Sequence, residues 1–100
     1  SVNNFWKMLA NEPETLERTW NSLQQVMKKG ALDEMTKELI YIAVSITNSC
    51  EYCIKSHSAA ALKKGATKDM LAELNAVVGM ANETNKLVES YQVKVDEIYE

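Results

Sequence analysis

The sequence has a single proline and three glycines among its 100 residues, so it contains few of the residues that force a chain to turn. No stretch alternates apolar and polar residues over more than a few positions, as a half-buried strand would. Apolar residues instead recur three or four positions apart, for example at Leu16, Trp20, Leu23 and Met27. These features exclude a β-rich or disordered chain and predict an all-α fold.

Long apolar runs and basic clusters are also absent. The longest uncharged stretch, residues 39–50, has about 12 residues, whereas a membrane-spanning helix needs about 20. The first residues, Ser-Val-Asn-Asn-Phe-Trp-Lys, lack the charged start and apolar run of a secretory signal. Eleven basic residues against fourteen acidic ones give a net charge of −3. We therefore expect a cytoplasmic protein that binds neither membranes nor nucleic acids.

Helix start and stop signals predict a bundle of five to six helices in one domain, residues 1–100. The expected elements are a short helix around Phe5, a second from Pro13 to near Gly30, a third capped by Asp33, a fourth from about Cys50 to Lys64 and a fifth capped by Thr67, with apolar spacing resuming at Val88 after a polar gap. Trp6, Trp20 and the methionines follow the helical period, which predicts positions in a core or an interface.

The third helix is apolar on two sides, because Ile40, Tyr41 and Val44 lie beside its main apolar face. We expect such a helix to be enclosed by its own fold, by a partner subunit, or by both. A chain of this length buries only about 60–65% of its unfolded surface, so self-association would help to stabilise it. The sequence thus favours a homo-oligomer.

Cysteine and histidine are scarce, yet both cysteines and the only histidine fall within residues 50–57. On a helix, Cys50, Cys53 and His57 lie within an arc of roughly 60°. Side chains three positions apart have Cβ atoms about 5–6 Å apart, so both the dithiol and the disulfide are accessible. A disulfide across so short a loop stabilises little, and a close pair in a chain of cytosolic character favours redox or metal chemistry.

Other interpretations of the pair fit less well. Structural zinc needs four ligands, and only Cys50, Cys53 and His57 are available unless Glu38 completes the set. Haem attachment requires a histidine directly after the second cysteine, where Ile54 stands. A thioredoxin-like motif needs a βαβ context that is missing, and inert helix packing remains open. Lys63, Lys64 and Lys68 surround a helix end, where the helix dipole and solvent explain them.

Glu38 is placed to meet His57. If the third and fourth helices form an antiparallel hairpin about Asn48 and Ser49, both side chains lie roughly 12–15 Å from the turn. A carboxylate on a largely apolar helix is costly unless it is paired, and the only histidine is an available partner. At the turn itself, Ser49 is interpreted as a helix cap.

Taken together, these residues resemble the AhpD-like alkylhydroperoxidases of the carboxymuconolactone decarboxylase superfamily. The motif of that family is a Glu followed by Cys-x-x-Cys-x-x-x-His, and the matching residues are Glu38, Cys50, Cys53 and His57. The similarity covers roughly residues 35–85, including Ala-Ala-Leu-Lys-Lys-Gly-Ala-Thr after the histidine. It implies an all-helical trimer or hexamer that reduces hydrogen peroxide or small organic hydroperoxides.

The resemblance also implies roles. Cys53 attacks the peroxide, Cys50 resolves the oxidised sulfur, and Glu38 with His57 relays protons. Proximity to His57 agrees with this order, but the helix dipole favours the thiolate at Cys50, which is nearer the N-terminus. Our hypothesis is that His57 acts first as base and then as acid. The family's namesake has a further histidine between the cysteines, where this chain has Tyr52.

Sulfur carries the two electrons, so no bound cofactor is required, and an external thiol or dithiol protein is expected to restore the dithiol. Two alternatives stay open. One is a general dithiol–disulfide oxidoreductase acting on thiols rather than peroxides. The other is a non-enzymatic helical assembly module whose cysteines bind metal or merely pack.

Overall fold

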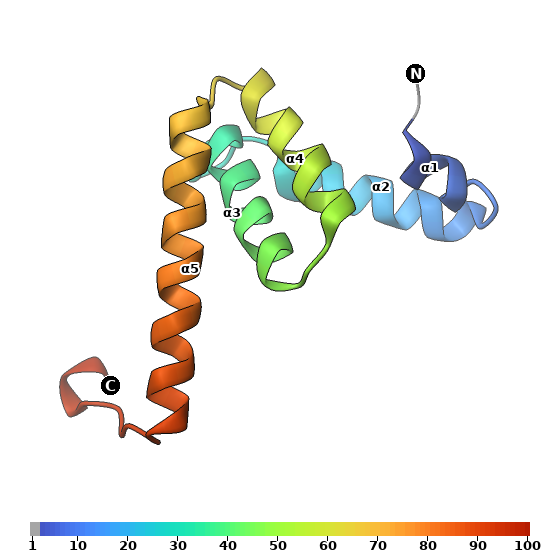
Figure 1. Ribbon diagram of the computed structural model, residues 1–100. Helices are drawn as coiled ribbons and strands as arrows, with labels where there is room; N and C mark the ends of the chain where they lie inside the picture. The colour runs from blue at the N-terminus through green and yellow to red at the C-terminus, as the bar shows by residue number, and fades with distance from the viewer. Residues whose placement is uncertain (1–2) are drawn as a thin grey trace. The chain divides into compact units, whose positions relative to one another are not determined.

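The computed structural model describes residues 3–100, and the described chain is helical without strands. The helices are α1 (Asn4–Leu9), α2 (Pro13–Met27), α3 (Glu34–Thr47), α4 (Glu51–Lys63) and α5 (Lys68–Ser90), followed by the short 3-10 helix η1 (Glu97–Tyr99) (Figure 1). The predicted all-α class is confirmed. The chain divides into two compact units, of which the first ends at Glu34 and the second comprises Met35–Glu100.

The first unit is built from α1 and α2. Asn3 caps α1, because its side-chain oxygen accepts from the Trp6 backbone N–H at 3.2 Å. Pro13 opens α2 as predicted, since a proline in the first turn removes no helical hydrogen bond. Trp6 and Trp20 meet edge to face with ring centroids 4.9 Å apart. Trp20 nevertheless stays 45% exposed, so the two rings form a local cluster rather than a sealed core.

The second unit is a hairpin of α3 and α4 with α5 packed against it (Figure 1). Its buried centre consists of Ile42, Ala61 and Ala66. Around this centre pack partly buried apolar side chains from α3 and α5, namely Met35, Leu39, Ile46, Met70, Leu71 and Leu74. Ala61 is the α4 residue at this centre, and its small side chain is fully buried there.

The turn between α3 and α4 corrects one prediction. Ser49 does not cap α4; it adopts a left-handed conformation with φ of 58° and ends α3. The Cys50 N–H reaches back to the Ser45 carbonyl at 2.9 Å, and the Ser49 N–H reaches the Ile46 carbonyl at 3.0 Å, a common way to close a helix. Cys50 itself is the N-cap of α4. The Cys50–Cys53 pair is therefore part of the start of α4.

Helix α5 continues through the polar gap noted in the sequence. Thr67 caps it as predicted, its hydroxyl accepting from the Met70 N–H at 3.1 Å. The helix then runs without interruption through the polar gap and ends at Ser90. The predicted resumption at Val88 is thus part of the same helix, whereas Val95 lies beyond it.

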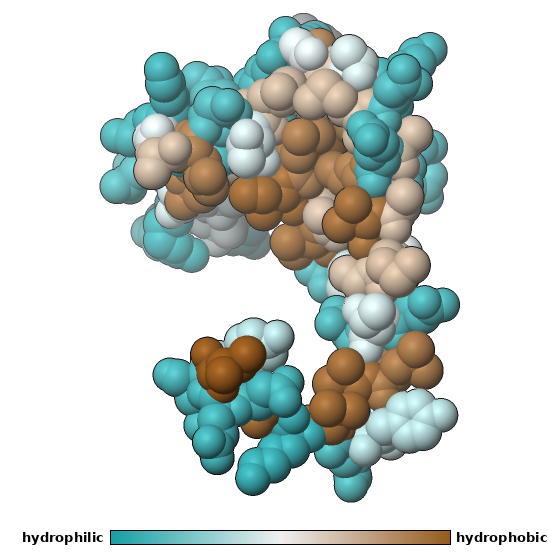
Figure 2. All heavy atoms as spheres, turned by 90° about the vertical axis from the view of Figure 1, so that its left-hand side faces the viewer, coloured by the Kyte–Doolittle hydropathy of each residue, from teal (hydrophilic) through white to brown (hydrophobic). Residues whose placement is uncertain are grey.

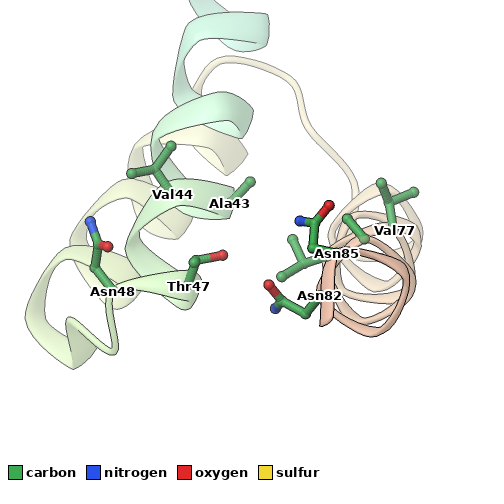
Figure 3. Close-up of a pocket in the computed structure, with 9 residues that line it drawn as sticks. Ala43, Val44, Thr47, Asn48, Val77, Asn82 and Asn85 are labelled. Atoms are coloured by element: carbon green, nitrogen blue, oxygen red, sulfur yellow. The ribbon is translucent and has the colours of Figure 1, made fainter. Parts of the chain in front are cut away.

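Several apolar side chains of the second unit face outward. On α3, Ile40 is 48% and Val44 is 53% exposed, so within the described residues the fold does not enclose this helix on both sides. A groove of about 310 Å³ lies between α3 and α5, where Asn82 and Asn85 point toward Thr47 (Figure 3). None of the helices described is long and apolar enough to cross a bilayer.

Candidate active site

Glu38 and His57 form the buried part of the site. The Glu38 residue is 3% exposed, and its Oε1 lies 2.6 Å from Nδ1 of His57. This contact between α3 and α4 is the one expected from the hairpin geometry. Because a carboxylate only accepts hydrogen bonds, Nδ1 carries a proton in this contact, so the lone pair of a neutral ring would lie at Nε2. Glu38 thereby orients the ring and selects the tautomer that is able to accept a proton at Nε2.

Cys50 and Cys53 are free thiols, both partly exposed. The Sγ atom of Cys50 accepts a hydrogen bond from the Cys53 backbone N–H at 3.3 Å. A hydrogen bond from the Cys53 side chain, and then this backbone bond, lower the pKa of the Cys50 thiol, against a small opposing effect of burial. The pKa of Cys53 is raised by its hydrogen bond to Cys50, by burial and by the charge of Cys50. In the reduced protein the thiolate is therefore favoured at Cys50.

Tyr41 lies against His57 and is influenced by the charges of Glu38 and both cysteines. It was not predicted as a site residue, because it was treated as part of an apolar side of the third helix. Its ring stacks on the His57 imidazole with centroids 3.7 Å apart and planes 23° apart. Burial raises the pKa of Tyr41, as do the negative charges of Cys53, Cys50 and Glu38, in that order. The hydroxyl therefore stays protonated beside the thiols. Its position one helical turn after Glu38 is the signal that was available.

Lys64 is the second residue that was missed, having been assigned to a solvated helix end. Its Nζ lies 3.0 Å from Oε2 of Glu38, so both oxygens of this carboxylate have partners. The signal in the sequence is spacing, because Lys64 follows His57 by seven positions and so shares its face of α4. Gly65, at φ of +105°, ends the helix directly after it.

Metal binding receives no support from this arrangement. Among residues 3–100, no group of three or more His, Cys, Asp or Glu side chains is placed to hold a metal ion. Glu38, which would have completed a ligand set, is instead engaged by His57 and Lys64.

A helical hairpin that carries a Cys-x-x-Cys pair at one helix start and a buried Glu–His pair beneath it defines an all-α dithiol domain. The model of the carboxymuconolactone decarboxylase family matches residues 13–94. The chain belongs to this family, which confirms the resemblance noted from the motif.

A solved relative has the same fold. The crystal structure of the alkylhydroperoxidase AhpD core from Rhodospirillum rubrum is 51% identical to this chain, with a TM-score of 0.95. The match covers 99% of this chain and 74% of that one.

Two curated relatives are more distant. The uncharacterized protein 4 in the cox locus of Paracoccus denitrificans is 42% identical over 48 residues, which are 48% of this chain and 43% of the relative. The alkyl hydroperoxide reductase AhpD of Corynebacterium aurimucosum is 29% identical over 69 residues, which are 69% of this chain and 39% of the relative. The chain thus spans about two fifths of the length of each of these proteins.

Proposed function

We propose that this protein is a thiol peroxidase that reduces hydrogen peroxide or organic hydroperoxides through Cys50 and Cys53, with Glu38 and His57 as a proton relay. Similarity to the AhpD core supports alkylhydroperoxidase-type chemistry. The observation that carries the proposal is the 2.6 Å contact of buried Glu38 with Nδ1 of His57. It supplies an oriented imidazole on the helix that bears both thiols.

The proposed reaction proceeds in two steps. A thiolate sulfur attacks one peroxide oxygen, the O–O bond breaks, and the departing oxygen takes the proton that His57 received from the thiol. The products are an alcohol, or water, and a sulfenic acid. The second cysteine then displaces water from this sulfur and forms the disulfide. The peroxide gains the two electrons that the sulfurs lose, and an external thiol or dithiol protein returns them.

The order of attack is part of the proposal, with Cys53 attacking and Cys50 resolving. The pKa directions favour the thiolate at Cys50, but ionisation alone does not decide the rate. A thiol with a pKa of about 8.5 gains only about 30-fold, roughly 2 kcal/mol, from full ionisation at pH 7. The leaving oxygen also needs a proton, and Cys53 is four positions from His57 whereas Cys50 is seven.

Rapid mixing with peroxide tests both the activity and the order. In Cys50→Ser, sulfenic acid is expected to accumulate at Cys53, because no second thiol resolves it. Cys53→Ser is expected to accumulate none at a comparable rate. The reverse pattern would assign the attack to Cys50, and slow oxidation of the wild type, comparable to that of a free thiol, would contradict a peroxidase.

A second candidate function is general dithiol–disulfide exchange. The observation that favours it is the lowered pKa of Cys50 at the start of α4, a feature that makes a good attacking and leaving thiol. Oxidation of the reduced protein by peroxide and by a small disulfide distinguishes the two. A peroxidase reacts faster with peroxide at equal concentration, and an exchange enzyme reacts faster with the disulfide.

We also propose that the chain is a homo-oligomer, a trimer or hexamer, assembled through α5. Exposed apolar side chains recur along this helix, with Val77 67%, Met80 59% and Leu87 49% exposed (Figure 2). With Tyr91, the C-cap of α5, they are spaced by three, seven and four positions, so they lie along one seam in which Thr84 occupies the intervening position.

Sedimentation equilibrium tests the assembly. The wild type is expected to have the mass of three or six chains at micromolar concentration. Met80→Glu is expected to shift the mass towards one chain, because a carboxylate cannot be buried unpaired in the seam. Glu89→Gln, which changes an exposed charge on the opposite side of α5, serves as the control. A wild type with the mass of one chain contradicts the proposal.

A further inference from the structure

The ion pair beneath the site involves a residue outside the four-residue motif. Lys64 Nζ lies 3.0 Å from Oε2 of Glu38, and the other oxygen of the same carboxylate contacts His57. The Glu38 side chain is 4% exposed and that of Lys64 is 31% exposed. The acid is thus held inside the fold, while the cation reaches it from the rim. We propose that Lys64 is a positioning residue that acts through Glu38 to keep His57 neutral, and therefore able to accept a proton, in the resting site.

The physical reason is charge balance around a buried carboxylate. With His57 as its only partner, ionised Glu38 would favour the imidazolium, since an opposite charge at this distance stabilises the charged form. An imidazolium cannot take a proton from a thiol. With Lys64 on Oε2, the carboxylate is already paired with a cation, and a second cation on Oε1 gains less. The imidazole then rests neutral, with its Nδ1–H donated to Glu38.

The helix ending places Lys64 for this role. The Lys64 N–H bonds back to the Ala60 carbonyl at 3.1 Å, and the Ala66 N–H bonds to the Ala61 carbonyl at 2.9 Å. Gly65 provides the left-handed turn that this closure requires. Long side chains on a helix lean towards its N-terminus, so Lys64 extends back along the face that carries His57. Lys63, one position earlier, lies about 100° around the helix.

The other groups near His57 do not supply this cation. From α3 the imidazole meets Glu38 and Tyr41. From α4 it shares its face with Cys50, Cys53 and Lys64, of which only Lys64 carries a positive charge. The side chains that α5 contributes to the adjoining core are apolar, namely Met70, Leu71 and Leu74. The role of this balance in catalysis rests on the proposed function, whereas the charge state of His57 does not.

A proton NMR titration of the imidazole tests the inference directly, because the chain has a single histidine and its ring protons are unique. In reduced Lys64→Met, which keeps the aliphatic length, the midpoint of the titration is expected to rise by about one pH unit. Lys64→Arg is expected to restore the wild-type midpoint. Lys63→Met, the matched loss of a neighbouring charge, is expected to leave it unchanged. An unmoved or lowered midpoint in Lys64→Met, or an equal rise in Lys63→Met, overturns the inference.

A second background tests the route through Glu38. In Glu38→Gln the carboxylate that links Lys64 to His57 is gone, so adding Lys64→Met is expected to move the midpoint much less than it does in the wild type. An undiminished rise would mean that Lys64 acts without Glu38, and the inference would fail.

The same variants distinguish the inference from the proposed function. In peroxide reduction, the midpoint of the acid limb of the pH–rate profile of Lys64→Met is expected to move to higher pH by the same amount as the NMR midpoint. Well below both midpoints, the variant is expected to turn over up to tenfold more slowly than the wild type. If the midpoint rises while neither protein reduces peroxide, the charge balance stands and the peroxidase proposal fails. If peroxide is reduced and the midpoint stays in place, the proposed function stands and the inference fails.

Discussion

The α3–α4 hairpin and helix α5 use their side chains in opposite ways. The hairpin turns charge inward, since Glu38 is 3% exposed and engages both His57 and Lys64. Helix α5 turns apolar groups outward, with Val77 67% and Met80 59% exposed. Each arrangement is costly for an isolated chain unless something offsets it. In the hairpin the offset is visible within the chain as the hydrogen bond of Glu38 with His57 and its ion pair with Lys64. Our proposals accordingly assign the chemistry to the hairpin and the assembly to α5.

The largest expected effect concerns proton transfer in the hairpin. His57→Gln is expected to slow single-turnover peroxide reduction by about 10²–10⁴-fold, the usual contribution of a positioned acid–base group. Stopped-flow mixing between pH 6 and 8 measures it. Glu73→Gln, which removes a carboxylate from the exposed surface of α5, serves as the control and is expected to retain the wild-type rate. An unaltered rate in His57→Gln would remove this residue from the mechanism.

The next effect contrasts the packing of the two regions. Ile42 on α3 is 2% exposed, so Ile42→Ala is expected to lower the free energy of unfolding by about 2–5 kcal/mol through lost burial and a cavity. The same type of truncation at Val77→Ala on α5 is expected to change it by less than about 0.5 kcal/mol in the monomer. Urea denaturation at low protein concentration measures both. Equal losses would mean that the two regions are packed alike.

The two ends of α4 give a smaller contrast. Gly65→Ala places a Cβ at φ of +105° with no atom within 4 Å, so only backbone strain of about 1–2 kcal/mol opposes it. Ser49→Gly relieves strain at φ of 58° but frees the unfolded chain, and a net change below about 0.5 kcal/mol is expected. Thermal unfolding compares them. A larger loss at Ser49→Gly would show that its side chain has a structural role.

The smallest effect is a difference in pH dependence between the thiols. Because hydrogen bonds from Cys53 lower the pKa of Cys50 while the pKa of Cys53 is raised, Cys50 ionises first as the pH increases. Alkylation by iodoacetamide, followed by peptide mass mapping, is expected to modify Cys50 at lower pH than Cys53. Cys53→Ala removes the side-chain donor and is expected to move the Cys50 profile to higher pH. Coincident profiles in the wild type would contradict the pKa assignment.

The hairpin could be predicted from the sequence because its signals are local. Apolar spacing indicated the helices, and equal distances from the turn brought Glu38 to His57. The contacts of Lys64 and Tyr41 at the site were not predicted, because they depend on how far a side chain reaches between helices rather than on periodicity. The cap at Cys50 was assigned to Ser49, since serine is the usual capping residue. The polar gap left the end of α5 undefined, because apolar spacing reports burial and an exposed helix continues without it.

Cys50, the N-cap of α4, also stabilises the start of this helix, in addition to its proposed role in the chemistry. Cys50 Sγ satisfies the N–H of Cys53, one of the amides at a helix start that has no partner within the helix. A sulfur in a disulfide accepts more weakly than a thiolate, so in the proposed redox cycle oxidation is expected to weaken this hydrogen bond and reduction to restore it. The redox state of the pair would then change the hydrogen-exchange rate of the Cys53 backbone amide, which can be measured.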